Sequence, residues 1–353
     1  MQKFGIRDIG EYVLFGRNTV GENGLALFWS GSGLEFYISA KNLYVTIECL
    51  YENMELMLDI ILEGERTQKL VLRKGIEKYQ VFSGMNPEKK IKVRLVRDTQ
   101  CMPEEKTSCL IIRDFESDGY FCGAPEYFYN IEFIGDSITS GEGCGLTTRD
   151  EWLPVVFDAL ENYTYKTAIK LNARYRVLSQ SGWGLYASWD ADTAHVLPDY
   201  YDKVCGISSC ERCIKVGALD DWVSDPDEMD AVIINLGTND STALKTGKFE
   251  KDTFIKDFKK KGIDFLKNIR KHNGSCVMVW AYGMLGNDME RYIIDAINDY
   301  KKETHDSRVE YLRLPECTGE DLGARFHPTP KGHEKAAAVL ADFLQSIQAF
   351  MLR

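Results

Sequence analysis

The sequence has 353 residues, a net charge of −11, and ordinary shares of hydrophobic (44%) and charged (27%) side chains. These values are typical of a globular protein of about two domains, and they exclude a disordered or fibrous chain. The acidic balance argues against a nucleic-acid partner, because lysine and arginine supply most of that affinity. No apolar run reaches the roughly 18 residues of a membrane span, so we expect no membrane partner and a cytoplasmic protein. A secretion signal removed by processing is the alternative.

The first 120 residues predict an all-β domain. Short runs rich in β-branched and aromatic residues, many of them alternating in polarity, are separated by glycine-containing turns. Regular short strands of this kind are typical of a sandwich or jelly roll. The runs are residues 34–39, 43–49, 56–62, 69–72, 78–82 and 91–96.

The remaining residues, 121–353, predict an α/β domain. Nearly continuous apolar runs are typical of buried parallel strands, and amphipathic helical segments alternate with them. The runs are residues 131–134, 231–236 and 276–281, and the helical segments are 251–271, 291–302 and 333–352. We therefore expect a jelly-roll domain at 1–120 and a three-layer α/β/α domain with a parallel sheet at 121–353.

Ligands of such sheets bind at the carboxyl ends of the strands, so the residues that follow each apolar run are the candidates for chemistry. Ser137 follows the first run within Gly135-Asp136-Ser137, where it is either a nucleophile on a tight turn or part of a helix cap. We interpret Asp136 as the residue that organises this turn.

Two further segments offer N–H donors for a developing oxyanion. Gly182, within Ser181-Gly182-Trp183, can present its backbone amide. Asn239 follows the second apolar run and can donate from its side-chain amide, although an Asn-Asp pair also forms turns.

A loop of three cysteines precedes the second apolar run. Cys205, Cys210 and Cys213 could hold zinc with a fourth ligand from elsewhere, form a disulfide, or remain plain thiols. No second pair follows at zinc-finger spacing, so we expect no cofactor and no metal.

His327 is the candidate general base among five histidines. It lies in a proline-bounded loop just before the last helical segment, which gives it the fixed position that a base needs.

These motifs, in this order, resemble the four blocks of the GDSL/SGNH hydrolase family over residues 127–353: Gly135-Asp136-Ser137, Gly182, Gly237-Thr238-Asn239-Asp240 and His327-Pro328. A finer resemblance, to carbohydrate esterase family two and its N-terminal jelly roll, covers nearly the whole chain. It rests on residues 30–36 and 43–47, on Ser181-Gly182-Trp183-Gly184 and on residues 232–240.

One position departs from the superfamily pattern. Most SGNH hydrolases carry an aspartate three residues before the catalytic histidine, and here that residue is Ala324. The resemblance to family two implies a Ser–His dyad in which a backbone carbonyl orients the ring, and Glu320 and Asp321 are alternative acceptors close in sequence. Whichever group serves must fix the tautomer so that Nε2 faces Ser137.

The resemblance implies a serine esterase that removes acetyl groups from acetylated carbohydrates, such as an acetylxylan esterase. Ser137 and His327 would be catalytic, and Ser137, Gly182 and Asn239 would form the oxyanion hole. Trp183, Asp240 and Phe326 are candidate sugar contacts, with Asp240 equally able to close a turn and with Trp189 and Trp222 as further aromatic platforms. The alternatives are a lipase or thioesterase with the same dyad and a carbohydrate-binding protein without catalysis. The oligomeric state is left open.

Overall fold

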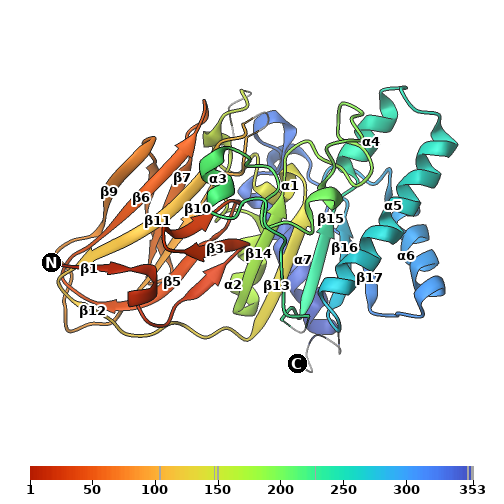
Figure 1. Cartoon of the computed structure of the whole chain (residues 1–353). Helices are drawn as coiled ribbons and strands as arrows, with labels where there is room; N and C mark the ends of the chain where they lie inside the picture. The colour runs from red at the N-terminus through yellow and green to blue at the C-terminus, as the bar shows by residue number, and fades with distance from the viewer. Residues whose placement is uncertain (103–104, 147, 149–150, 227, 348–349, 351–353) are drawn as a thin grey trace. The chain divides into compact units, whose positions relative to one another are not determined.

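The computed structural model describes residues 1–102, 105–146, 148, 151–226, 228–347 and 350 (Figure 1). The chain folds as two compact units: residues 1–126 with 203–221, and residues 127–202 with 222–353. The expected division after residue 120 therefore differs in two respects: the first unit extends to residue 126, and the segment 203–221 belongs to it.

Long-range hydrogen bonds hold this returning segment in the first unit. The Trp29 indole donates to the Val204 carbonyl at 2.7 Å, and the Thr19 hydroxyl donates to the Val216 carbonyl at 2.5 Å. Arg212 donates two hydrogen bonds of 2.7 Å to Glu48. Partners so far apart in sequence leave no mark in a local polarity pattern.

The first unit consists of two six-stranded sheets, and every strand pairing in them is antiparallel. One sheet has the order β3-β4-β11-β6-β9 with β1 beside β11, and the other has the order β12-β5-β10-β7-β8 with β2 beside β5. The strands are β1 (Gln2–Gly5), β2 (Val13–Phe15), β3 (Asn18–Gly21), β4 (Gly24–Leu27), β5 (Gly33–Ser39), β6 (Leu43–Tyr51), β7 (Met57–Leu62), β8 (Glu65–Val71), β9 (Gly75–Phe82), β10 (Ile91–Arg97), β11 (Ser108–Ser117) and β12 (Tyr120–Phe121).

A core of aliphatic and aromatic side chains from both sheets fills this unit. Phe36 of β5 and Phe115 of β11 meet edge to face with ring centroids 5.2 Å apart, and both are fully buried. Alternate residues of β6 point inward, as the sequence pattern indicates. A short helix, α3 (Glu211–Lys215), lies in the returning segment.

The second unit has a five-stranded parallel sheet of order β14-β13-β15-β16-β17. Its strands are β13 (Tyr129–Gly135), β14 (Ala173–Ser179), β15 (Ala231–Asn235), β16 (Val277–Tyr282) and β17 (Val309–Arg313). All five residues of β15 and all six of β16 are buried, which accounts for their continuous apolar sequences.

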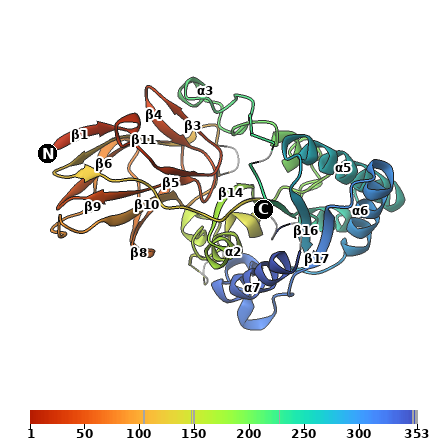
Figure 2. The same cartoon turned by 90° about the horizontal axis from the view of Figure 1, so that it is seen from below.

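Helices cover both faces of this sheet. Figure 2 shows α2 packed with α7 on one face and α5 packed with α6 on the other. The helices are α1 (Ser137–Ser140), α2 (Tyr163–Leu171), α4 (Thr238–Lys245), α5 (Lys251–His272), α6 (Glu290–Thr304) and α7 (Pro330–Ser346). This confirms the predicted three-layer fold, which follows an all-β domain along the chain. No helix of the described residues is long and apolar enough to cross a membrane.

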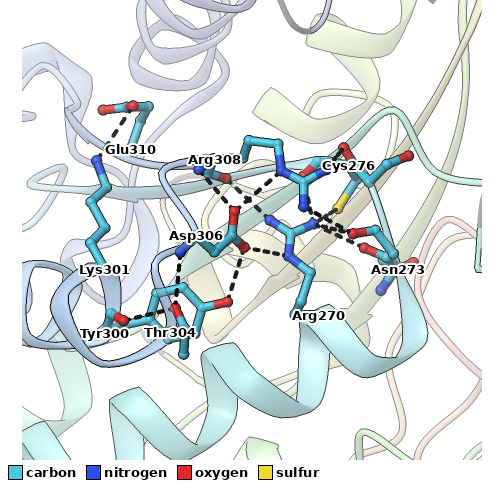
Figure 3. A network of polar contacts seen from close by, with 11 residues as sticks. Arg270, Asn273, Cys276, Tyr300, Lys301, Thr304, Asp306, Arg308 and Glu310 are labelled. Atoms are coloured by element: carbon cyan, nitrogen blue, oxygen red, sulfur yellow. Dashed lines mark hydrogen bonds and ion pairs between the residues drawn. The ribbon is translucent and has the colours of Figure 1, made fainter.

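A polar network ties the end of α5 to the chain entering β16 and β17 (Figure 3). Arg270 donates to Asp306 at 2.6 Å, and to the backbone carbonyls of Asn273, Gly274 and Cys276 at 3.0, 3.1 and 2.7 Å. The network lies at the amino ends of these strands, the edge of the sheet opposite to Ser137.

Candidate active site

Ser137 is the first residue of α1, and only Asp136 separates it from the end of β13. The side chain of Asp136 accepts a hydrogen bond from the Ile138 amide at 3.0 Å and so caps the helix, which is the organising role indicated by the sequence. The turn brings Ser137 to the carboxyl edge of the sheet, where it is 6% exposed.

His327 meets Ser137 across 190 residues of sequence. Its Nε2 lies 2.8 Å from Ser137 Oγ, and its Nδ1 lies 3.0 Å from the backbone carbonyl oxygen of Arg325. A carbonyl can only accept, so the ring carries its hydrogen on Nδ1 and presents the Nε2 lone pair to the hydroxyl. This is the tautomer that a general base for Ser137 requires.

Neither acidic candidate near the histidine orients its ring. Glu320 pairs with Lys331 at 2.7 Å, and Asp321 pairs with Lys335 at 2.5 Å. Ala324 is buried and has no acceptor in its side chain. The acceptor that bonds Nδ1 is therefore a backbone carbonyl, the arrangement that the resemblance to family two implies.

Gly182 and Asn239 follow β14 and β15, the two strands that flank β13. The Asn239 amide nitrogen donates to the Trp183 carbonyl at 3.0 Å and to Asp136 Oδ2 at 3.3 Å, directly beside the Ser137 turn. Gly182 has φ +81°, and a Cβ there would lie 2.8 Å from the Trp189 ring, so the position requires glycine. The three loops that carry the predicted oxyanion donors thus meet at one edge of the sheet.

Asp136 is fully buried beneath this turn. Burial raises its pKa to about 7, and the nearby charges of Asp240 and Glu142 act in the same direction, while the Ile138 amide opposes them. The group can therefore take up a proton near neutral pH while it still caps α1.

The structure places Asp240 in the second of its two predicted roles, which is to close a turn. The residue is fully buried, and its carboxylate accepts from the amides of Leu185, Tyr186 and Ala187 at 2.8, 2.8 and 3.0 Å. Asp240 thus fixes the loop that follows Gly182. Burial raises its pKa to about 6, against the opposing effect of these three amides.

The aromatic candidates differ in their access to solvent. Phe326, next to the catalytic candidate His327, is 81% exposed, and Trp189, whose ring lies against Gly182, is 59% exposed. Trp183 is only partly exposed and packs on Tyr200 with ring centroids 4.5 Å apart. Phe326 and Trp189 thus present more exposed ring surface than Trp183.

Cys205, Cys210 and Cys213 do not gather into a metal site among the described residues. The Cys210 and Cys213 sulfurs are 3.1 Å apart, whereas Cys205 accepts from the Ser208 amide at 3.5 Å. None of the ten cysteines forms a disulfide.

Two residues that lie beside His327, Glu142 and Arg325, were not predicted from the sequence. Glu142 follows α1 and is 1% exposed, and Arg325 donates to it from Nε at 2.9 Å. Glu142 is flanked by two glycines and lies close in sequence to Ser137, which could have marked it as a candidate. Its contact with Arg325 could not be predicted, because the two residues are far apart in sequence.

Comparison with known proteins identifies a family for this chain. The family model for GDSL-like lipase/acylhydrolase proteins matches residues 131–340. The solved structure of the acetyl xylan esterase Est2A from Butyrivibrio proteoclasticus is 33% identical with a TM-score of 0.94, and the match covers 99% of both chains.

Two curated relatives are more distant and longer. The acetylxylan esterase / glucomannan deacetylase of Cellvibrio japonicus is 26% identical over 61% of this chain and 56% of its own length. The cellulase/esterase CelE of Acetivibrio thermocellus is 25% identical over 89% of this chain and 37% of its own length. The chain thus spans about half or less of these curated relatives. With the family model matched from β13 into α7 and a full-length relative at 33% identity, the chain belongs to the GDSL-like lipase/acylhydrolase family.

Proposed function

We propose that the protein is a serine esterase that removes acetyl groups from acetylated carbohydrates through a Ser137–His327 dyad. The observation that carries this proposal is the 2.8 Å contact between Ser137 Oγ and His327 Nε2, with Nδ1 bonded to the Arg325 carbonyl. This arrangement supplies a nucleophile, a base and a fixed tautomer.

In the proposed reaction, Ser137 Oγ attacks the acetyl carbonyl while His327 Nε2 takes its proton. The backbone amides of Ser137 and Gly182 would stabilise the oxyanion, and the side-chain amide of Asn239 would join them by exchanging its longer contact, to Asp136, for the oxyanion. The imidazolium then returns the proton to the sugar oxygen as the ester bond breaks. Water hydrolyses the acetyl-serine by the same route, and the products are acetate and the free sugar hydroxyl.

Carbohydrate as the leaving group is supported by the exposed aromatic rings and by the relatives. Sugars stack on aromatic faces, and Phe326 and Trp189 present such faces at the site. The similar proteins from Butyrivibrio and Cellvibrio carry names that specify acetylxylan or glucomannan.

The test is hydrolysis of 4-nitrophenyl acetate, butanoate and octanoate, together with acetate release from acetylated xylo-oligosaccharides. We expect the wild type to prefer acetate, and we expect Ser137→Ala and His327→Ala each to lose at least about a thousandfold in kcat. A preference for octanoate would replace the proposal with a lipase or thioesterase. Glycan binding without hydrolysis would replace it with a binding protein.

A further inference from the structure

A buried carboxylate lies beside the catalytic histidine, although the usual aspartate position is occupied by Ala324. Glu142 Oε2 accepts from the Ser181 hydroxyl at 2.8 Å, and Oε1 accepts from Arg325 Nε at 2.9 Å. The same Oε1 lies 3.6 Å from His327 Nδ1. That distance is too long for a hydrogen bond but close enough for a charge to act on the ring.

The backbone that orients His327 has an unusual conformation. Arg325 and Phe326 have φ values of 55° and 59°, so two consecutive non-glycine residues adopt the left-handed region. Such conformations persist only where the surroundings hold them. The guanidinium of Arg325, tied to the buried Glu142, provides this restraint, and the carbonyl of Arg325 is the group that accepts from Nδ1.

The backbone next to Glu142 packs closely against His327. Gly143 has φ +88°, and a Cβ there would lie 2.7 Å from His327 Cβ and 2.9 Å from the Pro328 carbonyl oxygen. The Glu142 amide donates to the Ser137 carbonyl at 3.0 Å. Glu142 is thus attached through its backbone to the nucleophile turn and through its side chain to the turn that carries the base.

We propose that Glu142 is the positioning residue that replaces the missing acid, by holding Arg325 so that its carbonyl faces Nδ1 and by placing a negative charge beside the His327 ring. The inference rests on the proposed function, in which His327 becomes an imidazolium when it takes the Ser137 proton. A carboxylate beside Nδ1 stabilises that imidazolium, while the Arg325 carbonyl keeps the ring in the required tautomer.

The charged and titratable groups placed against His327 define the test. Glu142 contributes a negative charge, Arg325 contributes a positive one, and Asp136 lies below Ser137. His333 of α7 is buried, which lowers its pKa to about 3 and leaves it neutral. Removing the Glu142 charge and removing the Arg325 charge should therefore shift the titration of the His327 ring in opposite directions.

The experiment is an NMR titration of the full chain labelled with ¹⁵N-histidine, with His327→Ala to assign the signal. We expect Glu142→Gln and Arg325→Gln to move the titration midpoint of His327 in opposite directions, downward for the first variant and upward for the second. Glu320→Gln is the matched control, because that carboxylate pairs with Lys331, and we expect no shift. The inference would be overturned if Glu142→Gln or Arg325→Gln left the His327 midpoint unchanged, or if both variants moved it in the same direction. If Glu142→Gln does not fold, Arg325→Gln decides alone. An upward shift of the His327 titration midpoint then supports the inference, and an unchanged midpoint overturns it.

Turnover gives the second readout. Glu142→Gln should lower kcat for 4-nitrophenyl acetate by about 10- to 100-fold with an unchanged KM, and should move the acid limb of the pH–rate profile to lower pH. An unchanged kcat and profile in an active wild type would overturn the role of Glu142. A wild type without esterase activity that still shows the opposite NMR shifts would instead overturn the proposed function alone.

Discussion

Replacing Asp240 by alanine would remove one carboxylate that serves three consecutive backbone donors. The amides of Leu185, Tyr186 and Ala187 each lie within 3.0 Å of it, and the carboxylate is fully buried. A buried donor left without an acceptor costs about 1–3 kcal/mol. Ionised Asp240 is itself disfavoured by burial, which raises its pKa to about 6 and offsets part of this loss. We expect the free energy of unfolding to fall by about 3–5 kcal/mol.

The loop that these amides belong to also carries Gly182, so activity should fall together with stability. The measurement is urea unfolding at pH 8, followed by tryptophan fluorescence, with kcat for 4-nitrophenyl acetate measured on the folded variant. Asp288→Ala is the matched control, because the Asp288 carboxylate accepts from Ser241 and Lys245 of α4, the helix that also carries Asp240. The Asp288 side chain is 56% exposed, so we expect its loss to lower the free energy of unfolding by less than about 0.5 kcal/mol. A loss below about 1 kcal/mol in Asp240→Ala, with kcat unchanged, would refute the reasoning.

Three other perturbations test separate features. His333 is buried, which lowers its pKa to about 3, and its ring accepts a hydrogen bond from the Tyr163 amide. The contribution of His333 to the free energy of unfolding is therefore present above pH 6.5 and is lost as pH falls. Between pH 7 and 5 the wild type should lose about 2 kcal/mol more than His333→Asn in urea unfolding, and parallel curves would contradict this. Arg270→Met breaks the ion pair with Asp306 and three hydrogen bonds to carbonyls, and should lower the free energy of unfolding by about 2–4 kcal/mol. We expect kcat to stay unchanged, because the network lies at the edge of the sheet opposite to Ser137. Phe326→Ala should lower kcat/KM for acetylated oligosaccharides about three- to tenfold but leave 4-nitrophenyl acetate hydrolysis unaffected; equal losses on both substrates would argue against a sugar platform.

The candidate chemistry could be predicted where its signal is local in the sequence. Ser137 and Asn239 each follow a strand whose sequence is almost continuously apolar, and parallel strands direct their carboxyl ends to one edge. The outer strands were harder: β17 is only partly buried and mixes polar with apolar residues, and β14 carries two arginines, so neither was identified. A strand at the edge of a sheet needs less apolar sequence than a central one.

The sequence by itself therefore determined the fold class, the order of the motifs and the absence of an aspartate at position 324. The tertiary structure alone decided that the segment 203–221 joins the β-rich unit, that Asp240 faces backbone amides rather than solvent, and that Glu142 meets Arg325 and His327. The physical reason is that periodicity reports which face of an element is buried, whereas the partner of a buried polar group depends on which distant segment packs against it.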